Sequence, residues 1–236
     1  MSYPTFVAAG TLVSNANNIT GLAAPAGIRR GDLLLLLVET ANQVVVAADI
    51  TGEIGDQYVA APGAAPQGTG TAGLAGAVRL TVFYKFTTGT EANIGITDGN
   101  ARDHTAAVIL AFRNVDQLNP FNTSAGGVQA ATATSLTLPQ VTTSRSQCMI
   151  VNVVASDRDV NATNTTFSAW ANATTGAPTE RFDQTVTTGQ GGGFGVATAL
   201  LGAAGASGQT TVTTTNNTAA YITYALEPRR HFYSVS

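Results

Sequence analysis

The stretch GDLLLLLVET, residues 31–40, decides the fold class. Its apolar run, from Leu33 to Val38, is far shorter than the roughly 20 residues that a membrane-spanning helix needs. No segment of the chain places apolar residues at i, i+3, i+4 and i+7 behind a helix cap. A short, uniformly apolar run between turn-forming residues is typical of a strand that is covered on both faces. The run therefore predicts a central strand of an all-β fold.

Two further segments point to the same fold class. The run AAVILAF, residues 106–112, is as uniformly apolar as residues 33–38, so we expect a second central strand there. The segment VRLTVFYKF, residues 78–86, alternates instead, and one face of it would carry Val78, Leu80, Val82, Tyr84 and Phe86. Clusters of Gly, Pro, Asn and Asp separate these segments, as is typical of short antiparallel strands.

The second half of the chain repeats the pattern of the first. Three pairs of segments match in strand order and spacing: 18–40 with 134–156, 76–97 with 190–214, and 104–113 with 218–228. At a constant shift of 114 residues, Leu80, Val82 and Phe86 fall on Phe194, Val196 and Leu200. The connections near 60–76 and 156–164 differ, and these are positions where the loops of a β-sandwich are expected to vary. The similarity predicts an internal duplication.

Each copy would hold about eight short strands in about 110 residues, which suits two packed antiparallel sheets, as in a jelly roll. We therefore predict two tandem β-sandwich domains, residues 1–116 and 125–228. Pro120 interrupts any strand between them, so residues 117–124 are assigned to a linker. Residues 229–236 remain as a C-terminal arm.

Composition excludes several classes of function. The 236 residues are 44% hydrophobic but only 11% charged, against roughly 25% in ordinary soluble domains. The 11 basic residues form no cluster larger than Arg29–Arg30 and Arg229–Arg230, so the chain lacks the basic stripe that nucleic acid requires. We also expect no signal peptide and no membrane anchor. A surface so poor in charge suits a protein that is packed in an assembly.

The pair Asp103–His104 is the strongest candidate for catalysis. Neighbouring residues on an extended strand point to opposite faces, so the two cannot readily form the oriented dyad of a hydrolase. The chain has no G-x-S-x-G motif, and the second copy carries Thr218 at the position of His104. We interpret His104 as a structural residue at the mouth of a buried strand.

Other candidates for chemistry have simple structural explanations. The acidic segments DGNARD (98–103) and SDRDV (156–160) lack the full pattern of a calcium loop and fit turns. GQGGGFG (189–195) precedes a β-like run without a Gly-Lys-Ser/Thr, so we expect a flexible loop or a close backbone approach instead of a phosphate loop. Cys148 is the single cysteine, which excludes internal disulfides and cysteine-based zinc sites. We predict no catalytic residue, no cofactor and no metal site.

Aromatic residues suggest two kinds of binding surface. Trp170 and Tyr58 could form a sugar-stacking platform, although a Trp between apolar neighbours on a strand more often packs in a core. The arm EPRRHFYSVS, residues 227–236, follows the last predicted strand. It combines the residue types that are enriched in protein interfaces, and our candidate interface residues are Arg229, Arg230, Phe232 and Tyr233.

Several segments together resemble structural proteins of tailed bacteriophages. They are GDLLLLLVET, LTVFYKF with its following Thr/Gly turn, TAAVILAFRNVD, GGGFGVATALLGAAGASG and the closing ITYALEP. The resemblance covers most of the chain and rests on strand patterns. It implies a β-sandwich component of the virion, assembled in the host cytoplasm, often trimeric, and without catalytic residues. A capsid decoration or cement protein that contacts the major capsid protein is the function it favours.

Two alternatives remain open at this point. One is a tail-fibre or adhesin module that binds host-surface glycans through exposed loops and aromatic side chains. The other is a glycosidase with a sandwich fold, which would need two carboxylates held across a cleft. The 14 acidic residues are spread along the chain, and none of them form an obvious pair.

Overall fold

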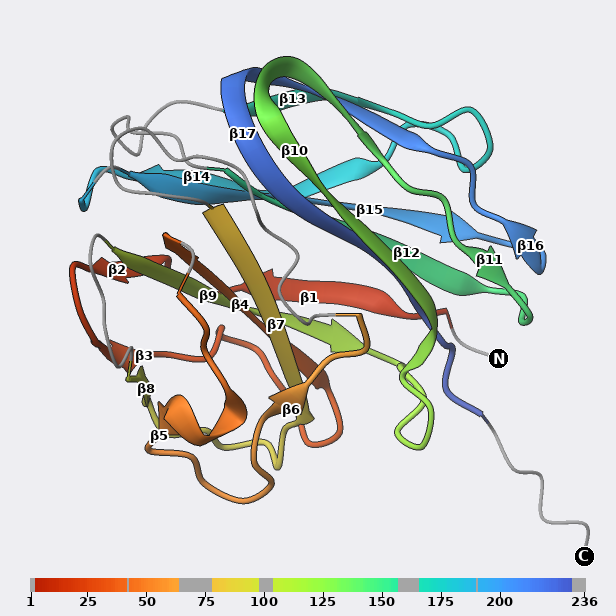
Figure 1. Ribbon diagram of the computed structural model, residues 1–236. Coiled ribbons are helices and arrows are strands. Elements are labelled where there is room, and N and C mark those ends of the chain that lie inside the picture. The colour runs from red at the N-terminus through yellow and green to blue at the C-terminus, as the bar shows by residue number, and fades with distance from the viewer. Residues whose placement is uncertain are drawn as a thin grey trace, which may run out of the picture.

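The computed structural model describes residues 3–41, 43–63, 78–97, 104–156, 166–189 and 191–230, and within these ranges the chain is all-β (Figure 1). Its strands form several antiparallel sheets, as the sequence predicts. The one helical element of the described ranges is the 3-10 helix η1, Ala47–Asp49. No helix in this part of the chain is long and apolar enough to cross a membrane.

The first large sheet is built from the N-terminal half of the chain. Its strand order is β1-β9-β4-β7-β6, and β2 pairs with the end of β9 that β1 leaves uncovered. The strands are β1 (Thr5–Ala9), β2 (Val13–Asn15), β4 (Leu33–Ala41), β6 (Val59–Ala60), β7 (Val78–Phe86) and β9 (Thr105–Arg113). The two uniformly apolar runs are thus the inner strands β4 and β9, as predicted.

The second large sheet is built from the C-terminal half. Its strand order is β10-β17-β12-β15-β14, and β13 pairs with the first part of β17. The strands are β10 (Phe121–Leu138), β12 (Cys148–Ser156), β13 (Phe167–Ala171), β14 (Thr179–Val186), β15 (Gly192–Leu201) and β17 (Thr210–Leu226). Two smaller sheets complete the described chain. They are β3-β8-β5 (Ile19–Leu22, Ile94–Ile96, Ile50–Thr51) and β11-β16 (Thr142–Thr143, Gly205–Ala206).

Strand β4 shows why its sequence is apolar at every position. Leu33, Leu35 and Leu37 belong to the cluster between the two large sheets. Their neighbours Leu34, Leu36 and Val38 belong to a second cluster, which includes Ile19, Ile94 and Ile96 of the small sheet β3-β8-β5. Because successive side chains on a strand point to opposite faces, a strand covered on both sides must be apolar throughout. Burying each Leu side chain stabilises the fold by roughly 1.5–3 kcal/mol.

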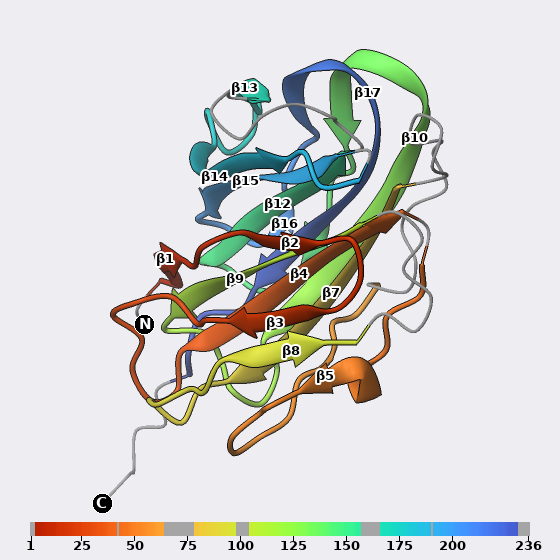
Figure 2. The same ribbon diagram turned by 90° about the vertical axis from the view of Figure 1, so that its left-hand side faces the viewer.

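The layers are stacked face to face (Figure 2). The largest apolar cluster joins β4, β7 and β9 to β12, β15 and β17, so the two halves of the chain share one core. On the far side of the second large sheet, Val154 and Ala197 pack against Leu136, Phe167 and Val212, which lie on β10, β13 and β17. Each large sheet is therefore covered on one face by the other large sheet and on its second face by strands of its own half.

The two large sheets have corresponding strand orders. Counted along the chain, β1, β4, β6, β7 and β9 take the same places in the first sheet as β10, β12, β14, β15 and β17 take in the second. The boundary between the halves lies close to the predicted linker. Strand β10 begins at Phe121, directly after Pro120, so the last residues of the segment 117–124 are already in a strand.

Candidate protein interface

The C-terminal arm begins as a backbone ladder against the segment that precedes the linker. Val115 and Pro228 form an isolated antiparallel bridge. On either side of it, the Asp116 N–H donates to the Glu227 carbonyl at 3.0 Å, and the Arg229 N–H donates to the Asn114 carbonyl at 2.8 Å. The chain therefore leaves β17 already paired with the end of the first half, and the position of Arg229 is fixed by its backbone.

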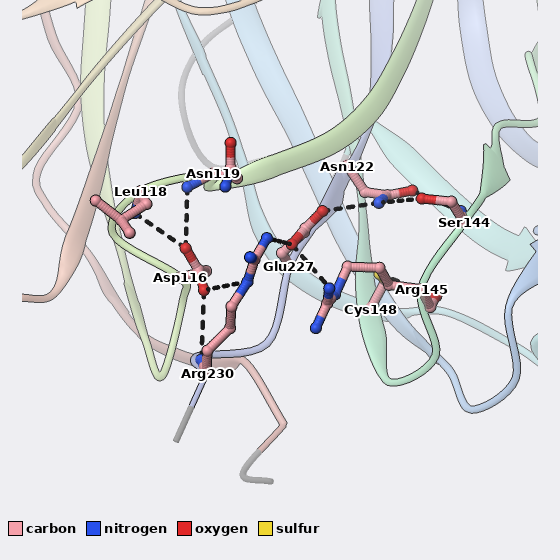
Figure 3. A network of polar contacts seen from close by, with 9 residues as sticks. All are labelled: Asp116, Leu118, Asn119, Asn122, Ser144, Arg145, Cys148, Glu227 and Arg230. Carbon is pink, nitrogen blue, oxygen red and sulfur yellow. Dashed lines mark hydrogen bonds and ion pairs between the residues drawn. The ribbon is translucent and has the colours of Figure 1, made fainter. Parts of the chain in front are cut away.

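A buried carboxylate, Asp116, holds both strands of this ladder in place (Figure 3). Its Oδ1 accepts hydrogen bonds from the N–H groups of Leu118, at 3.0 Å, and Asn119, at 2.9 Å, which folds the linker into a turn. Its Oδ2 lies 3.1 Å from Arg230 Nε and 3.3 Å from the Arg230 backbone nitrogen. One side chain thus ties the linker to the arm.

A second buried carboxylate, Glu227, completes the network in Figure 3. Its Oε2 lies 3.3 Å from Arg145 Nε and 3.4 Å from Arg230 Nη2. Its Oε1 accepts a hydrogen bond from Asn122 Nδ2 at 2.8 Å, and Asn122 also binds the backbone and hydroxyl of Ser144. Two acids and two arginines balance in charge. The arginine side chains are about one-third exposed, so each ion pair contributes at most about 1 kcal/mol, whereas an unpartnered buried carboxylate would cost more.

This network separates the four residues of the predicted interface. The guanidinium of Arg230 forms ion pairs within the chain, with Asp116 and Glu227. Arg229 is exposed and has no ion-pair partner in the described chain. Phe232 and Tyr233 lie outside the described residues. Arg230 remains a candidate interface residue, although its guanidinium is directed toward carboxylates 114 and 3 positions away in the chain.

Arg229 instead joins residues that the sequence analysis did not single out. It borders a surface pocket of about 390 Å³ together with Arg30, Gly31, Asp56, Phe86, Thr87, Thr88 and Gln117. A smaller neighbouring pocket of about 220 Å³ is lined by Asp116, Gln117, Leu118, Arg229 and Arg230. Leu118 is 76% exposed, the largest exposed fraction among the large apolar residues described. We call Arg30, Gln117, Leu118 and Arg229 the arm surface.

His104 does have an acidic partner, and it is Glu39. The Nε2 atom of His104 lies 2.7 Å from Glu39 Oε2, and both side chains are fully buried. Gly192 of the facing sheet covers the pair, since a Cβ there would collide with Glu39 Oε2 and lie 2.6 Å from His104 Nε2. No room remains between the pair and β15 for a substrate. Asp103 lies outside the described residues. The one signal for Glu39 was a carboxylate at the end of an apolar strand, which demands a partner when buried.

The predicted sugar-stacking platform does not form. Trp170 is 7% exposed, its Nε1 donates to Glu180 Oε2 at 3.0 Å, and its ring packs against Phe167. Tyr58 is 2% exposed and lies in the cluster around the small sheet β3-β8-β5. Burial and the nearby Glu91 and Glu53 carboxylates raise the pKa of the Tyr58 hydroxyl above its ordinary value. Both rings therefore pack in apolar cores. For Trp170, its apolar neighbours in the sequence already favoured this outcome.

The single lysine of the chain is also buried. Lys85 Nζ lies 2.5 Å from Glu91 Oε2, donates to the Ile54 carbonyl at 3.3 Å, and sits 5.2 Å from the centre of the Tyr58 ring. These contacts hold the loop between β5 and β6 and the loop that follows β7 against the sheet. Sequence reasoning missed this cluster because its members come from β7 and from two separate loops.

Metal and phosphate chemistry find no support in the described part of the chain. It contains no group of three or more His, Cys, Asp or Glu side chains arranged to hold a metal ion. The segment DGNARD and residues 157–160 lie outside it. Two glycines of GQGGGFG lie at close contacts: a Cβ at Gly193 would lie 2.5 Å from the Gln184 carbonyl oxygen, and one at Gly195 would collide with Phe167. The expectation of a close backbone approach is confirmed at Gly193.

Comparison with known proteins adds no family. No family model matches the chain, and no curated protein matches it. Among solved structures, the crystal structure of the STIV major capsid protein covers 95% of this chain and 95% of its own, at 10% sequence identity and a TM-score of 0.19. A TM-score that low carries no argument about fold or function.

Proposed function

We propose that the chain is a non-enzymatic structural protein of a tailed-phage particle, a decoration or cement protein that stabilises the capsid through protein–protein contacts. The observation that carries the proposal is that charged side chains are few and that several of them are buried in pairs. Only 11% of residues are charged, and Asp32, Glu39, Lys85, Asp116 and Glu227 are buried in pairs within the chain. Most of these pairs connect segments that are distant in the chain. The weakly charged surface that remains suits permanent contact with other proteins.

We infer further that the two halves arose by duplication of one jelly-roll-like sandwich, with residues 1–116 and 125–228 as the two units. The corresponding strand orders of the two large sheets support this, together with the constant shift from the core residues Leu80 and Val82 of β7 to Phe194 and Val196 of β15. Packed through their large sheets, the two units would form one stiff body. Such a body can hold two surfaces at a fixed separation without a flexible linker.

In this proposal the partner is the major capsid protein, and the chain acts as a homotrimer. Three copies bound to neighbouring capsomers would engage together, and weak single contacts would then add up through their high effective concentration. The arm surface lies where the linker and the start of the arm meet the first half, and it is the part of the described surface that we assign to this contact.

The test is co-sedimentation of the full-length chain with capsids assembled from the major capsid protein of the same genome, combined with light scattering of the free chain. A trimer that pellets at fixed stoichiometry supports the proposal. A folded chain that stays in the supernatant overturns it, and a screen against host-surface glycans would then test the fibre alternative. Truncation after Arg230 removes residues 231–236 and measures what the end of the arm contributes to binding. It retains the ion pairs of Arg230 with Asp116 and Glu227.

A further inference from the structure

The pocket between Arg30 and Arg229 is a built feature of the fold. Its walls come from the turn before β4, the loop before β6, the end of β7, the linker and the arm. Four of the other basic side chains, Lys85, Arg113, Arg145 and Arg230, form ion pairs within the chain. In the described ranges, Arg30 and Arg229 have no carboxylate within ion-pair distance, although they border the same pocket.

Hydrogen bonds fix the backbone at or next to both arginines. The Gly31 N–H donates to the Thr87 carbonyl at 2.8 Å, and the Thr87 N–H donates to the Asp32 carbonyl at 2.9 Å, which pins the turn of Arg30 to the end of β7. Arg229 is held by its own N–H on Asn114 and by the ladder at Pro228. Because the backbone of both arginines is already fixed, binding has to order only their side chains and no loop.

The charge of the pocket selects the class of ligand. Arg30 and Arg229 contribute two positive charges and Asp56 one negative charge, in a chain whose net charge is −3. A single carboxylate would neutralise the pocket, whereas a phosphate dianion would exceed its charge and face Asp56. Guanidinium groups match the planar geometry of a carboxylate with paired hydrogen bonds. The exposed Leu118 beside Arg229 offers an apolar contact next to the charged one.

We propose that this pocket binds the carboxylate of an Asp or Glu side chain on a partner protein, with an apolar neighbour of that residue packed against Leu118. The assignment of the partner to the capsid rests on the proposed function above; the carboxylate site itself rests on the pocket. Arg230 serves as a positioning residue, because its pairing with Asp116 and Glu227 leaves Arg229 as the outward-facing guanidinium of the arm.

The experiment compares full-length wild type with Arg30→Ala, Arg229→Ala and Arg229→Glu. Arg29→Ala is the matched control, because Arg29 is exposed and adjacent in sequence but does not border the pocket. In capsid co-sedimentation, Arg30→Ala and Arg229→Ala should each weaken binding roughly tenfold or more, as expected for loss of one partner of an interfacial charge pair. Arg229→Glu should abolish binding, and Arg29→Ala should bind like wild type. If wild type and the pocket variants pellet equally, the pocket assignment is wrong while the proposed function stands.

A second readout does not depend on the capsid. Arginine side-chain NMR signals are followed while sodium glutarate is added at constant ionic strength. Shifts at Arg30 and Arg229, with none at Arg29, support the carboxylate site even if no capsid is bound. Equal shifts at all three arginines, or a stronger response to inorganic phosphate than to glutarate, would overturn it.

Discussion

His104 Nε2 lies 2.7 Å from Glu39 Oε2 across the neighbouring strands β9 and β4, and both side chains are fully buried beneath Gly192 of the opposite sheet. The pair lies where the two halves of the chain face each other. Its closeness to the backbone of β15 makes the glycine a packing requirement, which leads to the first prediction.

Substituting Gly192→Ala should lower the free energy of unfolding by about 1–3 kcal/mol, because the added methyl group overlaps Glu39 and His104 in a packed core. Chemical denaturation followed by circular dichroism measures this. Gly202→Ala is the matched control, since a Cβ there meets no atom within 4 Å and its backbone φ is not positive. Equal stability of the two variants would contradict the packing at Gly192.

The role of Trp170 separates the core from the sugar-binding alternative. Trp170→Ala should destabilise the chain by about 3–5 kcal/mol, because it removes a buried ring from the cluster of Phe167 and Leu136. Leu200→Ala, in the same half but 43% exposed, should cost less than about 0.5 kcal/mol. Urea unfolding followed by far-ultraviolet circular dichroism compares them. A stable Trp170→Ala variant that loses glycan binding would instead restore the sugar platform.

Strand identity could be predicted from the sequence, but the partners of the strands could not. The apolar runs of β4 and β9 and the alternation of β7 follow from local patterns. Alternation shows that one face of β7 is buried without showing what buries it, and here the cover is the sheet of the other half. His104 and Glu39 are 65 residues apart, and Arg230 and Asp116 are 114 apart. The order of strands in a sheet brings such distant residues together, and the spacing of residue types along the sequence does not reveal which of them will pair.

Lysine chemistry should report on unfolding. Lys85 is the single lysine, and its side chain is 1% exposed and paired with Glu91. An amine-reactive ester at neutral pH should therefore label native protein at the α-amino group alone, and add one further label only after denaturation. Intact-mass measurement counts the labels, and Lys85→Met is the control that should never gain the second one. A rapid second label on the native protein would contradict the burial of Lys85.

Cys148 should make the stability depend on alkaline pH. Burial raises the pKa of its thiol from 9.0 to about 11, with the Glu227 carboxylate adding to the shift and Arg145 opposing it. The unfolded thiol deprotonates near pH 9 and the folded one near pH 11, so unfolding releases a proton between these values. The contribution of Cys148 is complete below pH 9 and is lost as the pH rises to 11, which amounts to roughly 2–3 kcal/mol. The measurement is the difference in unfolding free energy between wild type and Cys148→Ala at pH 7.5 and pH 10.5.

That difference isolates Cys148, because the buried hydroxyls of Tyr58 and Tyr224, whose pKa values are also raised, are present in both proteins and cancel. The same shift predicts the reactivity of the thiol. At pH 8 its thiolate fraction should be about a hundredfold below that of an unfolded cysteine, so native protein should react with a disulfide reagent at least that much more slowly. An unchanged difference between the two pH values, together with rapid labelling at pH 8, would mean that the thiol is exposed at the end of β12 next to Arg145.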